Sequence, residues 1–133
     1  MKNAQFAKSY QAVAVATASP GNLVLMLFDG ALRFLNTALH GFQNEDITKR
    51  NEDIHNNLLK AQRILRELQC SLDMDSGGEF SRRMHALYDF MIEELRKANL
   101  AKEPAPIQTV DRLLGEIRGA WSQMLEQSQS VAA

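Results

Sequence analysis

The stretch from Asp46 to Leu72, DITKRNEDIHNNLLKAQRILRELQCSL, decides the fold class of this chain. Its apolar residues recur at steps of three, four or seven positions, which places them along one face of a long α-helix. These residues are Ile47, Ile54, Leu58, Ala61, Leu65, Leu68 and Leu72. At about 1.5 Å per residue the helix forms a rod of roughly 40 Å with a single apolar seam.

A second helix is predicted upstream, over residues 19–39. Ser19 is a good N-cap, and Pro20 suits the first helical position, where its missing N–H costs nothing. The pair His40–Gly41 provides a stop signal. The sequence therefore predicts a helix, a short turn and then the long helix from Asp46.

Two more helices are predicted downstream. Ser76 and Glu79 have the spacing of a capping box, in which each side chain bonds the backbone of the other's turn, and Asn99 is a plausible end of that helix. Pro104 and Pro106 open the last helix. No segment has the alternating pattern of a strand, and the connections are short. We therefore expect an all-α protein, an antiparallel up-down four-helix bundle over residues 19–128, with a loosely ordered capping segment at 1–18 and a frayed tail at 129–133.

The overall composition bounds the class of function. The chain has 133 residues, of which 45% are hydrophobic and 23% charged, as expected for one globular domain. A net charge of -1 gives no electrostatic footprint for nucleic acid or an anionic membrane. Lys60, Arg63 and Arg66 alternate with acids and are interpreted as a solvated helix face. No apolar run approaches ~18 residues, so no membrane insertion is expected. We predict a cytoplasmic protein.

The single cysteine, Cys70, fits a reducing compartment, because one thiol forms neither an intrachain disulfide nor a zinc site. It lies in a helical pattern without a nearby histidine. We therefore expect Cys70 to be a buried structural thiol.

The first predicted helix is more apolar than one bundle position requires. The run from Leu23 to Phe28 is apolar on every side, whereas an ordinary bundle helix needs one stripe. Either this helix is buried on most sides, or one side faces the core and another lines a groove for a partner. The groove candidates, each of which competes with a place in the core, are Leu23, Met26, Leu27, Ile54, Leu58, Ile64 and Leu65.

The segment from Met1 to Ala18 carries a few large side chains, including Phe6 and Tyr10, in a run of small and polar residues. It either stays a disordered tail or packs those side chains onto the bundle and covers apolar surface until a partner arrives. Tyr10 is a natural displaceable cap, since its ring is apolar and its hydroxyl can stay in water.

A search for catalytic chemistry finds one Glu-x-x-His pair, Glu52 and His55. A di-iron bundle site needs two such pairs and glutamates from two other helices. His85 has Arg82 three residues before it, and the first helix has no glutamate. We therefore predict no metal, no cofactor, no catalytic residue and no enzymatic activity.

Many of these residues, in this order and spacing, resemble the flagellin-specific export chaperones of the FliS family. The matching residues are Tyr10, Thr17–Pro20, Met26–Leu32, Lys60–Gln62, Ile64, Glu67–Leu68, Ser71–Asp73, Gly77–Glu79, Leu87–Met91, Leu95, Ala98–Asn99, Arg118 and Trp121. Phe28 and Phe90 stand where a tyrosine is common in the family.

The resemblance implies an antiparallel four-helix bundle that binds the disordered C-terminal region of flagellin in the cytoplasm. Such binding prevents premature polymerisation and aids flagellar type III export, with the export gate and regulatory proteins as further partners. It also implies that the N-terminal segment caps an apolar groove and is displaced by the client. The alternative is a helical adaptor or regulator that binds another flagellar or regulatory protein.

Overall fold

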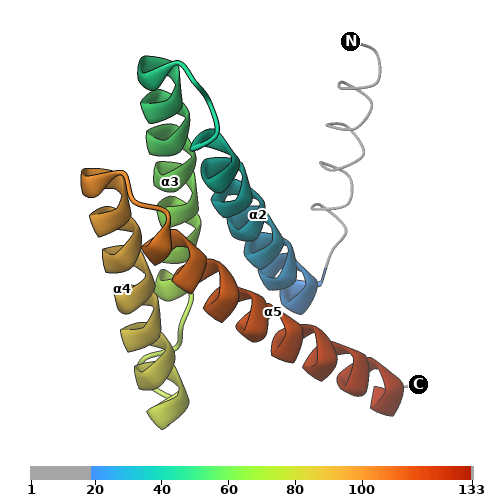
Figure 1. Cartoon of the computed structure of the whole chain (residues 1–133). Helices are drawn as coiled ribbons and strands as arrows, with labels where there is room; N and C mark the ends of the chain where they lie inside the picture. The colour runs from blue at the N-terminus through green and yellow to red at the C-terminus, as the bar shows by residue number, and fades with distance from the viewer. Residues whose placement is uncertain (1–18, 133) are drawn as a thin grey trace.

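The computed structural model describes residues 19–132, with side chains through residue 128. Four helices follow one another within these residues (Figure 1): α2 (Pro20–Gly41), α3 (Ile47–Cys70), α4 (Gly78–Ala101) and α5 (Ala105–Ala132). No strand occurs among residues 19–132. The helix α2 packs against α3 and α5, and α4 packs against the same two helices, with successive helices antiparallel. The predicted all-α, up-down four-helix bundle is confirmed.

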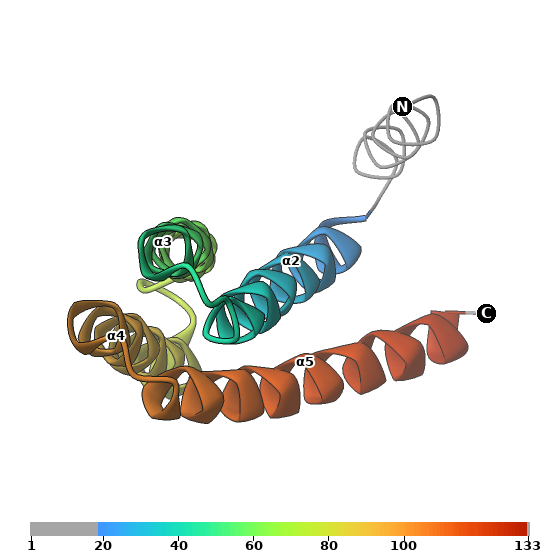
Figure 2. The ribbon, with the colours of Figure 1, turned by 45° about the horizontal axis from the view of Figure 1, so that its top comes forward.

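Helix α5 is the longest element. Its second half runs away from α3 and α4, beside the start of α2 (Figure 2). Trp121 Nε1 donates a hydrogen bond of 2.9 Å to the carbonyl of Gly21, which joins these two helices. The ring of Trp121 also meets Phe28 edge to face, with centroids 6.2 Å apart. The helix continues to Ala132, so the residues expected as a frayed tail include the last turn of α5.

The core is built from one seam of each helix. Fully buried residues recur at helical spacing because each helix presents one stripe to the bundle axis. The largest of these side chains are Phe28, Leu35, Ile54, Leu58, Leu65, Leu68, Met91, Leu95, Ile107, Val110 and Leu114. Ile47 breaks the pattern and is 68% exposed. The reason is that α2 ends at Gly41, which lies against Ile54, so Ile47 two turns earlier has no opposing helix.

The start of α4 differs from the predicted capping box. The N-cap position is Gly77, and no side chain caps it. The hydroxyl of Ser76 instead bonds the carboxylate of Asp73, whose Oδ1 also accepts the amides of Asp75 and Ser76. Asp73 thus closes the turn locally. The capping box does not form because the Ser76 hydroxyl is bonded to this carboxylate and Gly77 takes the N-cap position.

The other helix ends follow simple capping chemistry. Ser19 caps α2 by accepting the amide of Asn22 at 3.3 Å, as predicted. Asp46 caps α3 through the amides of Thr48 and Lys49. The end of α4 was predicted wrongly at Asn99, because the helix continues to Ala101 and ends where Lys102 adopts a left-handed φ of 53°.

By length and apolar character alone, α2 could cross a membrane, with 22 residues and a mean hydropathy of 1.2. In the fold it packs against α3 and α5, and its Asp29 accepts a hydrogen bond of 2.8 Å from Arg118 Nε. These contacts account for the side of α2 that faces the core.

Candidate functional site

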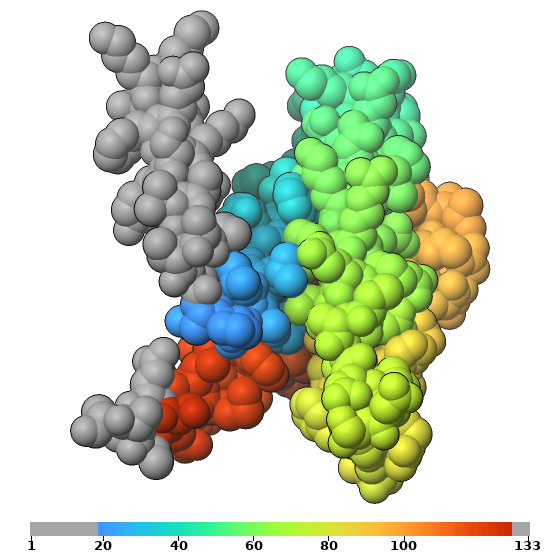
Figure 3. Space-filling view, turned by 180° about the vertical axis from the view of Figure 1, so that it is seen from behind, coloured from blue at the N-terminus to red at the C-terminus, as the bar shows by residue number. Residues whose placement is uncertain are grey.

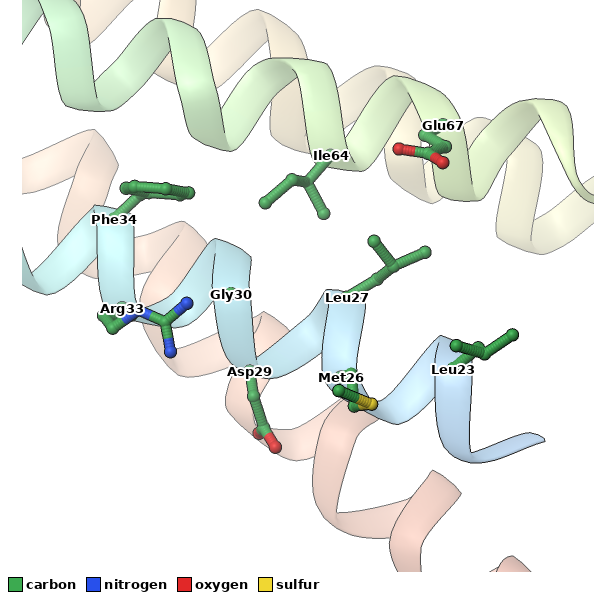
Figure 4. A pocket seen from close by; sticks show the side chains of 9 residues that line it. All are labelled: Leu23, Met26, Leu27, Asp29, Gly30, Arg33, Phe34, Ile64 and Glu67. Carbon is green, nitrogen blue, oxygen red and sulfur yellow. The ribbon is translucent and has the colours of Figure 1, made fainter. Parts of the chain in front are cut away.

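On the face of the molecule shown in Figure 3, α2 lies beside α3, and a groove of about 680 Å³ runs between them. The close-up in Figure 4 shows seven lining residues from α2 and two from α3. They are Leu23, Met26, Leu27, Asp29, Gly30, Arg33, Phe34, Ile64 and Glu67. The groove is open to solvent and largely apolar, which suits an extended or helical polypeptide.

The groove exists because α2 has two apolar sides. Phe28, Ala31 and Leu35 form the buried side that faces the core. Leu23, Leu27 and Phe34 lie on the other side, where the groove passes. One helix thus serves the core with one stripe and offers the second to the surface.

Gly30 allows α3 to come close at the middle of the groove. A Cβ atom at this position would lie 3.3 Å from Cδ1 of Ile64, which is tighter than ordinary contact. The absent side chain therefore leaves Ile64 at the bottom of the groove, between Leu27 and Phe34 (Figure 4). A mid-helix glycine costs up to about 1 kcal/mol relative to alanine, and its use here is close packing.

Charged side chains flank this apolar strip. The Phe34 ring has Lys60 Nζ at 5.4 Å and Arg33 Cζ at 6.0 Å from its centroid, within the range of cation–π attraction. Asp29 pairs with Arg118 of α5, and this contact raises the pKa of the Arg118 guanidinium. Glu67 lies at the opposite end of the groove from Phe34 (Figure 4).

The structure separates the groove residues predicted from the sequence into two groups. Leu23, Met26, Leu27 and Ile64 lie together along the groove. Ile54, Leu58 and Leu65 are fully buried and belong to the core, so a partner cannot touch them without opening the bundle. They belong to the main seam of α3, whereas Ile64 lies beside that seam and lines the groove.

The predicted cap residue Tyr10 lies outside the described residues. The sequence prediction also missed five residues that line the groove: Asp29, Gly30, Arg33, Phe34 and Glu67. Continuing the helical spacing from Leu27 by three and seven positions would have identified Gly30 and Phe34.

A second apolar cavity of about 450 Å³ lies at the other side of α2, where α4 and α5 diverge. All four helices contribute, and the wall is rich in aromatic and methionine side chains. They include Phe28, Phe80, Met84, Tyr88, Trp121 and Met124. Burial raises the pKa of Tyr88 to about 12, which keeps its hydroxyl neutral. The rim residue Phe80 is 63% exposed.

A polar cluster centred on the buried Gln69 joins α3 to α4 beside this cavity. The Gln69 amide donates to Asp89 Oδ1 at 2.7 Å and to the His85 carbonyl at 3.0 Å, while Arg66 donates to Gln69 Oε1 at 2.6 Å. Gln69 is only 4% exposed, so these bonds satisfy an amide that would otherwise be costly to bury. The Gln69 bond is the main cause of the lowered pKa of Asp89.

Within residues 19–132, no group of three His, Cys, Asp or Glu side chains lies close enough to hold a metal ion. His55, of the Glu-x-x-His pair, contacts Asn99 of α4 through Nδ1 at 2.9 Å. Cys70 is exposed, so its prediction as a buried thiol was wrong. The reason is that Cys70 ends α3 beside the turn to α4.

Comparison with known proteins gives consistent matches over nearly the whole chain. Residues 1–128 match the family described as "Flagellar protein FliS". The chain is 36% identical over 118 residues to the flagellar secretion chaperone FliS of Bacillus subtilis, covering 89% of this chain and 84% of that protein. The FliS chaperone of Salmonella typhimurium is 38% identical over 112 residues, 84% of this chain and 80% of the relative. That of Vibrio cholerae is 30% identical over 130 residues, 95% and 93% of the two chains.

Proposed function

The chain belongs to the FliS family of flagellar secretion chaperones, and from this premise we propose that it binds the disordered C-terminal region of flagellin in the cytoplasm. Binding prevents premature polymerisation of the client and aids its delivery to the flagellar type III export machinery. The protein performs this role by contact alone, without catalysis. The relatives are flagellar secretion chaperones, which supports the chaperone class.

The observation that carries the proposal is the apolar groove between α2 and α3. Leu23 and Met26 lie along this groove and are not among the side chains packed on the core cluster. An amphipathic client segment buries its own apolar face there, and each buried methylene contributes about 0.8 kcal/mol. Ordering a disordered client costs several kcal/mol, so the net affinity is moderate, as a complex that must later release requires.

Residues 1–18 act, in this proposal, as a cap over the groove in the free protein, with Tyr10 as the displaceable side chain. The place where this segment joins the bundle supports its role as a cap. Ser19 directly follows the segment, and its carbonyl accepts the amide of Leu23, the first groove residue, at 2.9 Å. The segment therefore joins the bundle at one end of the groove and needs no long connection to cover it.

A second role, as an adaptor for the export gate or a regulatory protein, is favoured by the cavity between α4 and α5. This cavity lies on a different side of α2 from the groove, since Val24 and Phe28 line the cavity while Leu23 and Leu27 line the groove. A partner seated there leaves the groove open to the client, so the two functions are compatible.

The proposed function is tested by calorimetric titration with a synthetic peptide from the C-terminal region of flagellin of the same bacterium. We expect one-to-one binding with a negative heat-capacity change, the mark of apolar burial coupled to folding. Met26→Asp places a charge in the groove and abolishes this binding. Leu100→Asp is the matched control, because Leu100 is 73% exposed on α4 and lies outside the groove.

Two results would contradict the proposal. One is the absence of heat at several temperatures together with no co-elution of peptide and protein. The other is equal loss of binding in Met26→Asp and Leu100→Asp, which would mean that the peptide does not enter the groove. Circular dichroism of both variants checks that the bundle remains folded.

A further inference from the structure

The two ends of the α2–α3 groove carry opposite charges. At one end, Arg33 and Lys60 approach the Phe34 ring from α2 and α3. Both side chains are exposed, and neither forms a salt bridge with another described residue. Arg63 is also exposed and lies between Lys60 and Glu67 on α3, one turn from each, so it distinguishes neither end of the groove.

At the other end the uncompensated charge is negative. Glu67 lines the groove near Leu23 and Leu27, and it has no salt-bridge partner among residues 19–132 (Figure 4). Asp29, the other acid of the groove, is already paired with Arg118 at 2.8 Å. The strip between the two ends is apolar, so the charges differ along the length of the groove rather than across it.

An α-helix carries its own polarity. Its free N–H groups give roughly half a positive charge at the N-terminus, and its free carbonyls give the same negative charge at the C-terminus. Acids are therefore favourable near the first turn and cations near the last turn. A groove with Glu67 at one end and Arg33 and Lys60 at the other complements a helix in one direction and opposes it in the reverse direction.

We propose that the α2–α3 groove binds a client helix in a single direction, parallel to α2, with the first turn of the client at Glu67 and its last turn at Arg33 and Lys60. This inference rests on the proposed client-binding function and adds to it the polarity of the bound segment. The partner is an amphipathic helix whose apolar stripe faces Leu27, Phe34 and Ile64 and whose C-terminal carbonyls meet the two cations.

Cys70 supplies a direct test of direction. It is the only cysteine in the chain, it is exposed, and it lies one turn beyond Glu67 on α3, at the Leu23 end of the groove. A spin label on Cys70 is paired with a second label at either end of one flagellin-derived amphipathic peptide. The distances in the two complexes are measured by pulsed dipolar spectroscopy.

We expect the N-terminal label of the peptide to lie closer to Cys70 than the C-terminal label. The difference should be roughly 15 Å, close to the rise of α2 from Leu23 to Phe34 at about 1.5 Å per residue. The reverse order, or equal broad distributions in a complex that does form, overturns the direction while leaving the groove as the client site. Failure of the labelled protein to bind either peptide removes the proposed function together with the direction.

Charge reversal provides the second measurement. The double variant Arg33→Glu and Lys60→Glu should weaken peptide affinity by about tenfold at low salt, with a smaller effect at high salt. Control variants carry Arg82→Glu, alone or with a second exposed charge on α4 reversed, because α4 does not line the groove. Equal affinities for the groove variant and the control would overturn the proposal that these cations select the direction.

Discussion

The separation of core from groove predicts different outcomes for two isoleucines of the same helix. Ile54 is fully buried, and its Cγ1 lies 3.3 Å from the position that a Cβ on Gly41 would occupy. Ile64 is partly exposed and lines the groove. Ile54→Ala and Ile64→Ala delete the same atoms from α3, so their difference reports the surroundings alone.

The expected size of each effect follows from burial. Ile→Ala removes three carbons, worth about 2.4 kcal/mol at about 0.8 kcal/mol each when fully buried. At Ile54 a closed cavity adds to this, for a total of about 3–4 kcal/mol. At Ile64 the groove is open and no closed cavity forms, so the loss is about 1 kcal/mol. With about 4 °C per kcal/mol, the value at which the ranges for smaller and larger domains meet, Ile54→Ala lowers the Tm by about 12–16 °C.

Client binding should show the opposite ranking. Ile64→Ala removes apolar contact from the groove and weakens peptide affinity by about five- to tenfold, the equivalent of 1.0–1.4 kcal/mol. Ile54→Ala, measured at a temperature where it is folded, binds with nearly the affinity of the unsubstituted protein. Urea unfolding followed by circular dichroism gives the stabilities, and calorimetric titration gives the affinities.

The reasoning is refuted if the two variants lose similar stability, because Ile64 would then be a core residue. It is equally refuted if folded Ile54→Ala loses more affinity than Ile64→Ala. That result would mean that the client enters the bundle instead of lying in the groove.

Three further predictions follow from the described contacts and from the N-terminal cap. Gly30→Leu fills the groove at a position where even a Cβ would lie 3.3 Å from Ile64. Peptide affinity should fall at least about tenfold, while circular dichroism shows the same helical content. Unchanged affinity would argue against this site. Gln69→Ala removes the main cause of the lowered pKa of Asp89, and the Asp89 pKa should return toward 3.8 in an NMR titration. A carboxyl group whose pKa is lower in the folded state than in the unfolded state stabilises the fold at pH values above its unfolded pKa. The contribution of Asp89 is therefore present at neutral pH and is lost as the pH falls below 3.8. Stability should accordingly fall less steeply with acid in Gln69→Ala than in the unsubstituted protein. Removal of residues 1–18 should increase the binding of a hydrophobic dye, and equal binding by the intact and truncated chains would contradict the cap.

Several expectations from sequence failed where two local signals competed. The Ser76 capping box lost to Asp73, whose carboxylate bonds both the amide and the hydroxyl of Ser76. Asn99 did not end α4, and Lys102 took the left-handed position instead. Such end effects involve small energy differences, so tertiary contacts and neighbouring side chains decide them.

The candidate site was only partly predictable for a different reason. The excess apolar character of α2 correctly indicated more apolar surface than a core stripe needs, and the structure has cavities on two sides of this helix. Ile54, Leu58 and Leu65 were also named as groove candidates, and they are buried. Periodicity identifies a stripe but does not state which neighbour covers it.

The sequence by itself determined the number, order and type of the helices within residues 19–132, because the apolar period and a cap such as Ser19 are local properties of the chain. Only the tertiary structure decided which apolar side of α2 is core and which is groove. That choice depends on where α3 and α5 approach, and Gly30 sets one such approach by admitting Ile64. The packing of distant segments is a property of the whole bundle, and the sequence of one helix does not determine it.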